Sequence, residues 1–568
     1  MTKVHMPKAL LGRVSGFKRS EKLAEAGRRL VHDGVVSING YPEVAVDIQQ
    51  DWSANPLGSR SWQWAVAAFR FMPALIARHA ASGDNSALDW AMSALRTWQR
   101  AVAGPLRKYE FAHNDHAVAN QAENLVFLLA YLSSEGIREK DQAEIAVAIR
   151  NHARLLSIDD FYSRHTNHGI EQSRILAVIG DFLVADPDAR GWLALAVGRL
   201  GDELDFAFTK EGVHVENSPG YHAYVCLSFL KILDYFPREE IAELADRIDA
   251  LMPRAIRFLT HITRPDGTLP IIGDTVNDPI PNYFKRYRKT RDYTHLRYAT
   301  TDGAEGQPPS QTAVLYPQAG YFIARDAWQP PGEGRSAFHL VLRCGYRSAY
   351  HRHDDDLNIV LYCDGEDWLV DSGAYRYAED DPIRRYVRSK WGHNVPVVRT
   401  PPRLRWKWAA PELVLPMLRL PSAEGVSAVR AVTRTYPDHV ATRDLIACPT
   451  GRTFDVVDTL VPSGPPVRRN YLSLWHIPAD KDIRIEEKCV VVTSRRTGAR
   501  LVIENLTARR AKIHLVDPGI PGQQGASYSP FSNTLEPVQV LAFEWAGNHL
   551  HSLLRFRFEA AAPGEPVI

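Results

Sequence analysis

The hydrophobic pattern of this 568-residue chain changes its period near the middle, and this change constrains the fold more than any other feature. In the first half, apolar residues recur every three to four positions, which is the spacing of one face of an α-helix. The segments with this pattern are 61–79, 86–102, 116–133, 141–156, 170–184, 192–208, 222–235 and 239–262. Because they are similar in length and closely spaced, we expect antiparallel helical hairpins, arranged as a bundle, a solenoid or a closed α/α toroid.

The second half alternates apolar and polar residues in short runs, the pattern of strands that bury one face. The polar, Gly- and Pro-rich segment 301–310 is a plausible linker between the halves. The alternating runs are 338–342, 358–362, 368–370, 426–435, 453–460, 490–492, 501–503 and 542–556. Pro and Gly interrupt them at short intervals, as in an antiparallel sandwich. We therefore predict an α+β multidomain chain with an N-terminal extension (1–50), a helical domain (51–305) and an antiparallel β-sandwich (306–568).

Overall charge does not indicate a partner, because the net charge is only +2. Arginines are nevertheless dense between Arg343 and Arg405, and a basic segment around a site favours an anionic substrate. A solvated face explains the same arginines equally well. Gly-rich phosphate loops and base-stacking modules are absent, so we expect neither an organic cofactor nor a nucleic-acid partner.

The five cysteines are scattered and lack CxxC spacing, which argues against a disulfide framework and against a cysteine zinc site. The first residues have no apolar core of signal-peptide length, and no apolar run is long enough to span a membrane. The expected location is therefore cytoplasmic by default, with a periplasmic or secreted location by another route as the alternative. The sequence is compatible with a monomer or an oligomer.

A set of metal-type ligands is dispersed through the predicted strands. His351 and His353 are two apart, so both side chains face one side of a strand. Asp371 ends the apolar run 368–370, and His393 follows after 22 positions. Zinc accepts neutral imidazole and carboxylate, commonly from three protein ligands. Two such histidines alone are more often hydrogen-bonded polar residues, but the four together predict a metal or catalytic site.

Two further segments lie where loops enter helices in the first half. Asn167 and His168 precede a predicted helix, whose first turn offers N–H groups and a positive dipole to an anion. The simpler alternative is an Asn cap beside an incidental histidine. Tyr221 lies in the first turn after Ser218-Pro219; such a tyrosine is usually amphipathic packing, but near a cation it can transfer protons.

Three weaker candidates complete the set. Asn114 and His116 open another predicted helix, and Tyr386 lies in the Arg-rich stretch between Asp371 and His393. No Gly-x-Ser-x-Gly motif supports a serine nucleophile.

Together these segments resemble the heparinase II/III superfamily of polysaccharide lyases, which includes heparinase-like and alginate-lyase-like proteins. The segments that carry the resemblance are Tyr350 to Asn358 (YHRHDDDLN), Gly365 to Tyr377 (GEDWLVDSGAYRY), Tyr386, Trp391 to Asn394 (WGHN), Asn167-His168, Ser218 to His222 (SPGYH) and Leu269 to Asp274 (LPIIGD). The resemblance implies an N-terminal α/α toroid followed by an antiparallel β-sandwich. It also implies cleavage of a uronic-acid polysaccharide by β-elimination, which leaves an unsaturated uronate.

The resemblance assigns roles by position. The catalytic residues it implies are Asn167, His168, Tyr221 and His351. The substrate-binding residues proposed for the same site are Tyr386, Asn114, His116 and Glu171. The zinc ligands it implies are His353, Asp371 and His393, with a mainly structural role for the metal.

A physical scheme follows for such an elimination. Removing the C5 proton of a uronate leaves an enolate-like dianion, and hydrogen bonds from Asn167 and a histidine would stabilise it. Tyr221 or a histidine removes the proton, and Tyr221 can protonate the departing oxygen; the sequence leaves the base open. One alternative is a glycoside hydrolase on the same toroid, with Glu171 and Glu216 as paired carboxylates. Another is a non-catalytic glycan-binding or exopolysaccharide-biosynthesis protein that keeps the fold.

Overall fold

The computed structural model describes residues 4–103, 109–277, 284, 293–328, 330, 332–333, 336–345, 347–348, 350–399, 414–436, 438–520 and 523–561. The chain forms two compact units. The N-terminal unit comprises Met1–Ala207 and Ser228–Ala250, and the C-terminal unit comprises Phe208–Leu227 and Leu251–Ile568. Each is described by itself below. The domain bounds expected from the sequence stay a prediction.

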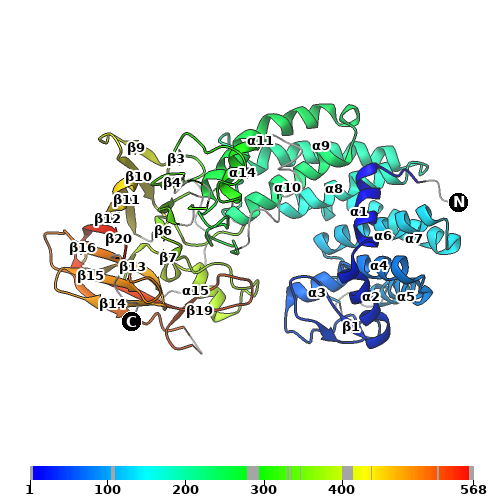
Figure 1. Ribbon diagram of the computed structural model, residues 1–568, viewed down its shortest axis with the longest axis horizontal. Coiled ribbons are helices and arrows are strands. Elements are labelled where there is room, and N and C mark those ends of the chain that lie inside the picture. Colours follow the sequence, from blue (N-terminus) through cyan, green and yellow to red (C-terminus); the bar gives the residue numbers. More distant parts are fainter. Residues whose placement is uncertain are drawn as a thin grey trace. The chain divides into compact units, whose positions relative to one another are not determined.

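The N-terminal unit is built from helices, coloured blue to green in Figure 1. They are α1 (Lys8–Lys18), α2 (Glu21–Asp33), α3 (Arg60–Ala67), α4 (Met72–Ser82), α5 (Asn85–Val102), α6 (Asp115–Glu135), α7 (Glu139–Ser157), α8 (Asn167–Phe182) and α9 (Ala189–Ala207). Strands β1 (Val35–Val36) and β2 (Val44–Ala45) form a small antiparallel pair. Successive helices pack in pairs, α4 on α5, α6 on α7 and α8 on α9, as expected for helical hairpins. Closure of these hairpins into a toroid stays a prediction.

The helix predicted over 61–79 is wrong as a single element, because the chain forms α3 and α4 instead. Phe69 lies between them with a φ of 58°, a left-handed conformation that ends a helix. Pro73 then occupies the first turn of α4, where its missing N–H costs nothing. The predicted extension also contains two helices, and Ser20 caps the second of them by accepting from the Leu23 N–H at 3.3 Å.

Two further helices have their ends in different units: α10 (Pro219–Tyr235) and α11 (Ala242–Ile262). The remaining described helices of the C-terminal unit are short, α14 (Thr294–Thr300) and α15 (Pro382–Arg388). No helix within the described ranges is both long and apolar enough to cross a membrane.

The C-terminal unit contains three antiparallel sheets among its described residues. The first has the order β3-β4-β5-β6-β7, with β3 (Ala313–Tyr316), β4 (Tyr321–Arg325), β5 (His339–Arg343), β6 (Asn358–Cys363) and β7 (Glu366–Leu369). The second has the order β14-β15-β16-β20-β12-β11-β10-β9, with β9 (Leu418–Leu420), β10 (Ser427–Thr433), β11 (His439–Cys448), β12 (Thr453–Pro462), β14 (Lys481–Ile485), β15 (Cys489–Ser494), β16 (Arg500–Asn505) and β20 (Leu550–Glu559). The third joins β17 (Lys512–Val516), β19 (Glu536–Gly547), β13 (Arg469–Pro478) and β8 (Pro396–Val398), with β18 (Ala526–Tyr528) beside β19. A helical half followed by antiparallel sheets confirms the predicted fold class.

The alternation read from the sequence puts one face of β12 in the core, whereas β4, β5 and β6 are buried on both faces. Along β12, every second residue from Phe454 to Leu460 is buried. The Phe454 and Phe556 rings stack with centroids 4.5 Å apart, and Trp475 packs on Phe556 at 4.6 Å. Burying such a side chain stabilises the fold by about 1.5–3 kcal/mol.

The strand predicted over 542–556 is wrong as one element. It is β19 in the third sheet and β20 in the second, so the turn after Gly547 carries the chain from one sheet to the other.

Candidate active site and metal centre

The start of α8 presents Asn167 and His168 in its first turn. Thr166 caps the helix by accepting from the Gly169 N–H at 3.1 Å. A Cβ at position 169 would lie 2.4 Å from the Ser163 carbonyl oxygen, so only glycine lets the preceding loop approach this closely. The tight loop thereby fixes where both candidate side chains begin.

His168 belongs to a small polar cluster at this end of α6 and α8. Its Nδ1 is 3.0 Å from Asp115 Oδ2, which also accepts a hydrogen bond from the Ser163 hydroxyl. The His116 ring stacks on His168 with centroids 4.4 Å apart, and the Trp64 ring contacts His116 in a tilted arrangement with centroids 4.8 Å apart. The His168 side chain is 39% exposed, so one edge of the cluster is open to a ligand.

The pKa values in this cluster follow from burial and mutual charge. Burial opposes ionisation of Asp115, but the hydrogen bond and attraction from His168 hold its pKa below the usual range. Burial, reinforced by the nearby His168, lowers the pKa of His116 to about 4. His116 is therefore neutral at pH 7.

The other two predicted substrate-binding residues of this unit have internal partners. Asn114 is the cap of α6, and its Oδ1 accepts from the Ala117 N–H at 2.9 Å. Glu171 is 2% exposed; its Oε2 accepts from Arg174 at 2.7 Å and its Oε1 from the Ser228 hydroxyl at 2.6 Å. Substrate binding by either residue stays a prediction.

In the C-terminal unit, hydrogen bonds join the segment before α10 to the loop that carries His351. Asn217 Nδ2 donates to the Ser348 and Tyr350 carbonyl oxygens at 2.7 and 2.9 Å. The Ser218 hydroxyl accepts from the Tyr221 N–H at 3.4 Å, which caps the helix start. These bonds bring Tyr221 to His351 across 130 positions of sequence.

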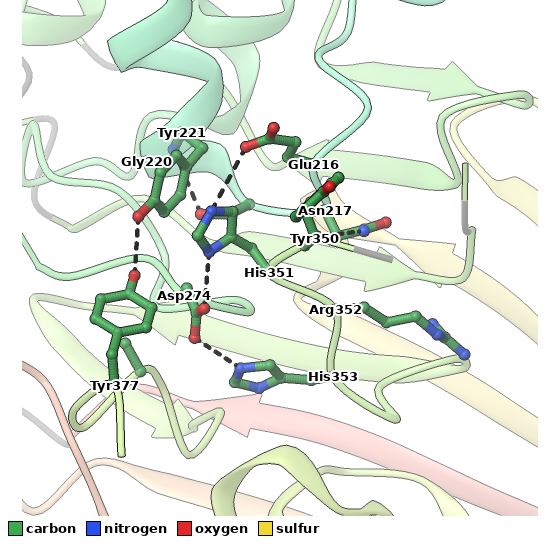
Figure 2. A network of polar contacts seen from close by, with 12 residues as sticks. Glu216, Asn217, Gly220, Tyr221, Asp274, Tyr350, His351, Arg352, His353 and Tyr377 are labelled. Carbon is green, nitrogen blue, oxygen red and sulfur yellow. Dashed lines mark hydrogen bonds and ion pairs between the residues drawn. The ribbon is translucent and has the colours of Figure 1, made fainter. Parts of the chain in front are cut away.

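The Tyr221 phenol ring lies flat on the His351 imidazole, with centroids 3.6 Å apart and 18° between planes (Figure 2). Its hydroxyl is 3.0 Å from the Tyr377 hydroxyl. Burial raises the pKa of the Tyr221 phenol above its ordinary value, so the ring keeps its proton at neutral pH. The arrangement holds a protonated phenol against an imidazole.

His351 itself has a φ of 53°, a left-handed conformation that is uncommon for a residue with a side chain. Strained backbone of this kind clusters at functional sites, where surrounding contacts maintain it. Its Nε2 lies 3.5 Å from a Glu216 carboxylate oxygen, and its Nδ1 lies 2.9 Å from Asp274 Oδ2. The ring is therefore held between two carboxylates, as Figure 2 shows.

Asp274 reaches this position because Gly273 precedes it. Gly273 has a φ of 58°, and a Cβ there would lie 2.8 Å from the Asn217 carbonyl oxygen and 3.4 Å from that of His351. The Asp274 side chain is 1% exposed. Burial opposes its charge, but Arg384 and the two adjacent imidazoles hold the pKa of this carboxyl well below its usual range.

The buried residues His353, Asp371 and His393 form a candidate metal centre. Their ligand atoms all lie within 4.8 Å of one another. Asp371 Oδ2 accepts from His393 Nδ1 at 2.9 Å and from Asn358 Nδ2 at 2.5 Å, which orients the carboxylate. Burial lowers the pKa of His353 to about 4, so its imidazole is neutral, the form that binds metals.

The donor set fits a metal ion. His353 Nδ1 and His393 Nε2 are both buried and have no hydrogen-bond partner. A buried polar atom without a partner carries a desolvation cost of about 1–3 kcal/mol, which a bound cation would remove. Two imidazole nitrogens and a carboxylate are also the ligands that zinc accepts.

A second buried carboxylate lies two positions beyond His353. Neither oxygen of Asp355 has a hydrogen-bond partner, and its side chain is 1% exposed. Burial raises its pKa to about 6. Sequence reasoning missed this residue, since it treated the run of three aspartates as part of a motif rather than as separate side chains.

The arginines between Arg343 and Arg405 are largely engaged inside the unit. Arg352 pairs with Asp356 at 2.9 Å, Arg384 with Asp274, Arg376 with Asp381, Arg388 with Glu379 and Arg399 with Glu544. Arg403 and Arg405 lie outside the described residues. The local basic excess is thus smaller than the sequence suggested.

Tyr386, the remaining predicted substrate-binding residue, is 7% exposed. Its hydroxyl is 3.2 Å from His476 Nε2, which is itself 2.9 Å from the Trp391 carbonyl oxygen. Substrate binding by Tyr386 stays a prediction.

The structure brings the predicted residues together within each unit. Tyr221 contacts His351 in one cluster, the three metal-type ligands form a second, and His168 with His116 forms a third. The partners that sequence reasoning did not assign are Asp115, Asp274, Tyr377 and Arg384. Asp274 was within a recognised motif, but its contacts span 77 and 79 positions, which local patterns do not encode.

Solved structures share this fold. A crystal structure of heparinase III matches with a TM-score of 0.79 at 16% identity, covering 97% of this chain and 86% of that one. A heparan sulfate lyase from Pedobacter heparinus matches with a TM-score of 0.66 at 17% identity, covering 95% and 83%. Identities this low establish likeness of fold alone.

Curated relatives match part of their own length. A heparin-sulfate lyase of Bacteroides stercoris is 23% identical over 428 residues, which cover 69% of this chain and 62% of that protein. A second heparin-sulfate lyase, from Bacteroides thetaiotaomicron, is 25% identical over 273 residues, covering 42% and 37%. The chain thus spans less than two thirds of the length of these relatives.

Two family models account for most of the chain. The model described as Heparinase II/III N-terminus matches residues 13–296, which is half of the chain, and the model described as Heparinase II/III-like, C-terminal, matches residues 308–518. The chain therefore belongs to the heparinase II/III family.

Proposed function

We propose that this protein is a polysaccharide lyase that cleaves a uronic-acid-containing anionic polysaccharide by β-elimination. Family membership and two relatives named heparin-sulfate lyase support this proposal. The observation that carries it is the protonated Tyr221 phenol, stacked on His351 and hydrogen-bonded to Tyr377.

Tyr221 is proposed as the general acid. Its pKa is raised by burial, so the phenol retains a proton that it can give to the departing glycosidic oxygen. To act instead as the base, the phenol would need a pKa lowered by nearby cations. The nearby carboxylates Asp274 and Glu216 instead raise the pKa of the Tyr221 phenol.

A histidine is then proposed as the base that removes the C5 proton. His351 is held in contact with Tyr221, and His168 is the partly exposed candidate of the N-terminal unit. Asn167, with the histidine that is not the base, is proposed to hydrogen-bond the uronate carboxylate. Hydrogen bonds to an oxygen on which charge develops stabilise the transition state more than the ground state.

The residues proposed to hold Zn²⁺ at the metal centre are His353, Asp371 and His393, through two imidazoles and a carboxylate. When bound, the ion would crosslink the loop before β6, the end of β7 and the segment before β8. Its role is thus proposed to be structural, since it holds the loop that carries His351.

The substrate class proposed first is heparin or heparan sulfate, because both curated relatives are named for it. Other uronate polymers, including alginate, hyaluronan and chondroitin, are the comparison substrates. The hydrolase alternative lacks a supporting observation, because the Glu171 carboxylate is committed to Arg174 and Ser228.

The test is a panel of these polymers incubated with the zinc-loaded protein, read by the ultraviolet absorbance of unsaturated ends. Tyr221→Phe should fold and bind metal normally but lose turnover by about 10²–10⁴-fold, the usual effect of one positioned proton-transfer group. Tyr316→Phe is the matched control, because its buried hydroxyl has no hydrogen-bond partner. Undiminished product from Tyr221→Phe would contradict the acid role, and no product from any uronate polymer would contradict the lyase proposal.

A further inference from the structure

We propose that Asp274 is a positioning residue that fixes the tautomers of His351 and His353 and so couples metal binding to the geometry of His351. The inference rests on the proposed function for the roles of these two histidines. Its basis is a single buried carboxylate that both imidazoles share.

The shared contacts are short and lie within the C-terminal unit. Asp274 Oδ2 is 2.9 Å from His351 Nδ1, and Oδ1 is 2.9 Å from His353 Nε2. The carboxylate is ionised through its pairing with Arg384, whose guanidinium donates to both of its oxygens. An ionised carboxylate only accepts hydrogen bonds, so each imidazole must donate an N–H from the nitrogen that faces it.

Arg384 fixes the orientation of this carboxylate. Its Nη1 donates to Oδ1 at 2.6 Å and its Nη2 to Oδ2 at 3.0 Å, while Nη1 also donates to the Ala374 carbonyl oxygen at 2.7 Å. A planar guanidinium that engages both oxygens prevents the carboxylate from rotating. Asp274 thus receives four hydrogen bonds, two from Arg384 and one from each histidine.

For His353, the shared proton decides which nitrogen can bind a metal. With a proton on Nε2, the neutral ring keeps its lone pair on Nδ1, which is the buried nitrogen without a hydrogen-bond partner. Metal-binding histidines usually donate their other N–H to a carboxylate, which orients the ring and raises its basicity. Asp274 supplies that partner.

For His351, the same carboxylate holds a proton on Nδ1. The neutral ring then carries its lone pair on Nε2, the nitrogen that lies 3.5 Å from Glu216. His351 also has the left-handed backbone noted above, and the hydrogen bond to Asp274 helps to keep its ring flat against Tyr221. Asp274 therefore determines which tautomer His351 adopts.

One carboxylate serving two imidazoles makes the two sites dependent on each other. An outer partner of a metal-binding histidine typically contributes 10- to 100-fold in metal affinity. Coupling between two sites is reciprocal, so a change at the metal site must also act on the His351 hydrogen bond. Segment 269–274, one of those that carry the family resemblance, would thus supply the carboxylate that positions both imidazoles.

The test compares the full-length protein with its Asp274→Asn variant, without any polysaccharide. The zinc affinity of each is measured by competition with a chromophoric chelator. The protonation of individual ring nitrogens is read by nuclear magnetic resonance on protein labelled with nitrogen-15 in histidine, and His351→Gln and His353→Gln variants assign the signals. Asp326→Asn is the matched control, since Asp326 pairs with Arg452 at 3.0 Å and accepts from the Phe338 N–H away from both histidines.

The expected wild-type spectrum shows His351 protonated on Nδ1, and zinc-bound His353 protonated on Nε2. Asp274→Asn should weaken zinc binding by about 10- to 100-fold and lose the defined Nδ1 proton of His351. Asp326→Asn should change neither. The proposal is overturned if His351 Nδ1 lacks a proton in the wild type, or if Asp274→Asn keeps both the zinc affinity and the tautomer.

These readouts separate this inference from the proposed function. The wild-type spectrum decides the tautomers even if Asp274→Asn does not fold. If no uronate polymer is cleaved but both readouts come out as expected, the lyase proposal fails and the role of Asp274 stands. Where a cleaved polymer is found, Asp274→Asn should lower kcat more than it changes KM, because it alters the placement of His351 rather than substrate contacts.

Discussion

The polar cluster around His168 in the N-terminal unit and the one around Asp274 in the C-terminal unit differ in burial and in the hydrogen bonds of their central carboxylates. In the N-terminal unit, His168 shares one carboxylate with a serine and leaves 39% of its side chain exposed. In the C-terminal unit, His353 is fully buried, and its partner Asp274 receives four hydrogen bonds. The first cluster is open to water and a ligand, whereas the second is organised before any ligand arrives.

The difference bears on the separate roles proposed for the two clusters. A buried carboxylate that accepts four hydrogen bonds holds its partners in one geometry, because each displaced hydrogen bond carries a large cost in a low-dielectric interior. A half-exposed histidine can instead adapt to a polymer and exchange water for it. We therefore expect chemistry to depend most on the C-terminal cluster and binding to depend most on the N-terminal one.

The largest expected effect comes from the core beneath the N-terminal cluster. Glu171→Ala would remove a carboxylate that pairs with the buried, charged Arg174 guanidinium. Breaking a buried ion pair typically lowers the free energy of unfolding by about 3–5 kcal/mol. Glu144→Ala, which removes an exposed pair with Arg96, should cost only about 0–1 kcal/mol. Denaturant unfolding measures the free energy of unfolding of both variants. Hydrogen exchange of α8 reports the local effect of Glu171→Ala. If Glu171→Ala is as stable as the wild type but binds substrate weakly, Glu171 belongs to the open cluster instead.

Removing a metal ligand should act on the C-terminal unit alone. His353→Ala is expected to lose zinc and with it about 3–4 kcal/mol of stability, the linkage expected at a zinc concentration several hundred times the dissociation constant. Hydrogen exchange of helices α4 to α7 should not change. His551→Ala, a histidine on β20 outside the metal set, is the control. Full zinc content of His353→Ala by elemental analysis would show that the ligand assignment is wrong.

The smallest effect is expected at the open cluster. Asp115→Asn removes the anion beside His168, but water can replace part of that contact, so we expect about a tenfold loss of kcat/KM, or about 1.4 kcal/mol. Asp202→Asn is matched to it, because Asp202 lies 3.1 Å from another histidine, His165, in an exposed position. A loss for Asp115→Asn as large as that for Tyr221→Phe would remove the distinction between the two clusters.

Periodicity predicted the fold class well, because helices and strands differ in spacing over many residues. It failed where the chain changes direction, at Phe69 between α3 and α4 and at the turn after Gly547 that joins β19 to β20. A left-handed phenylalanine and a turn that changes sheets leave little trace in hydrophobic spacing.

Residue type predicted much of the candidate site. Chemistry and spacing grouped His351, His353, Asp371 and His393. The family resemblance then separated the last three as metal ligands, and the structure places their ligand atoms together. Asp274 and Tyr377 could not be assigned in the same way, because their contacts arise from the folding of distant segments onto one another. An isolated aspartate after a glycine gives no local sign of the imidazoles that it will meet.

The central claim is that the bond is broken by elimination rather than by water, and it can be tested directly. The zinc-loaded protein is incubated in water enriched in oxygen-18 with the uronate polymer that the panel identifies as its substrate. The product masses are measured by mass spectrometry. Elimination predicts unsaturated ends, product masses that sum to that of the substrate, and no solvent oxygen at the cut. One heavy oxygen gained at each cut, with no unsaturated end, would contradict the account.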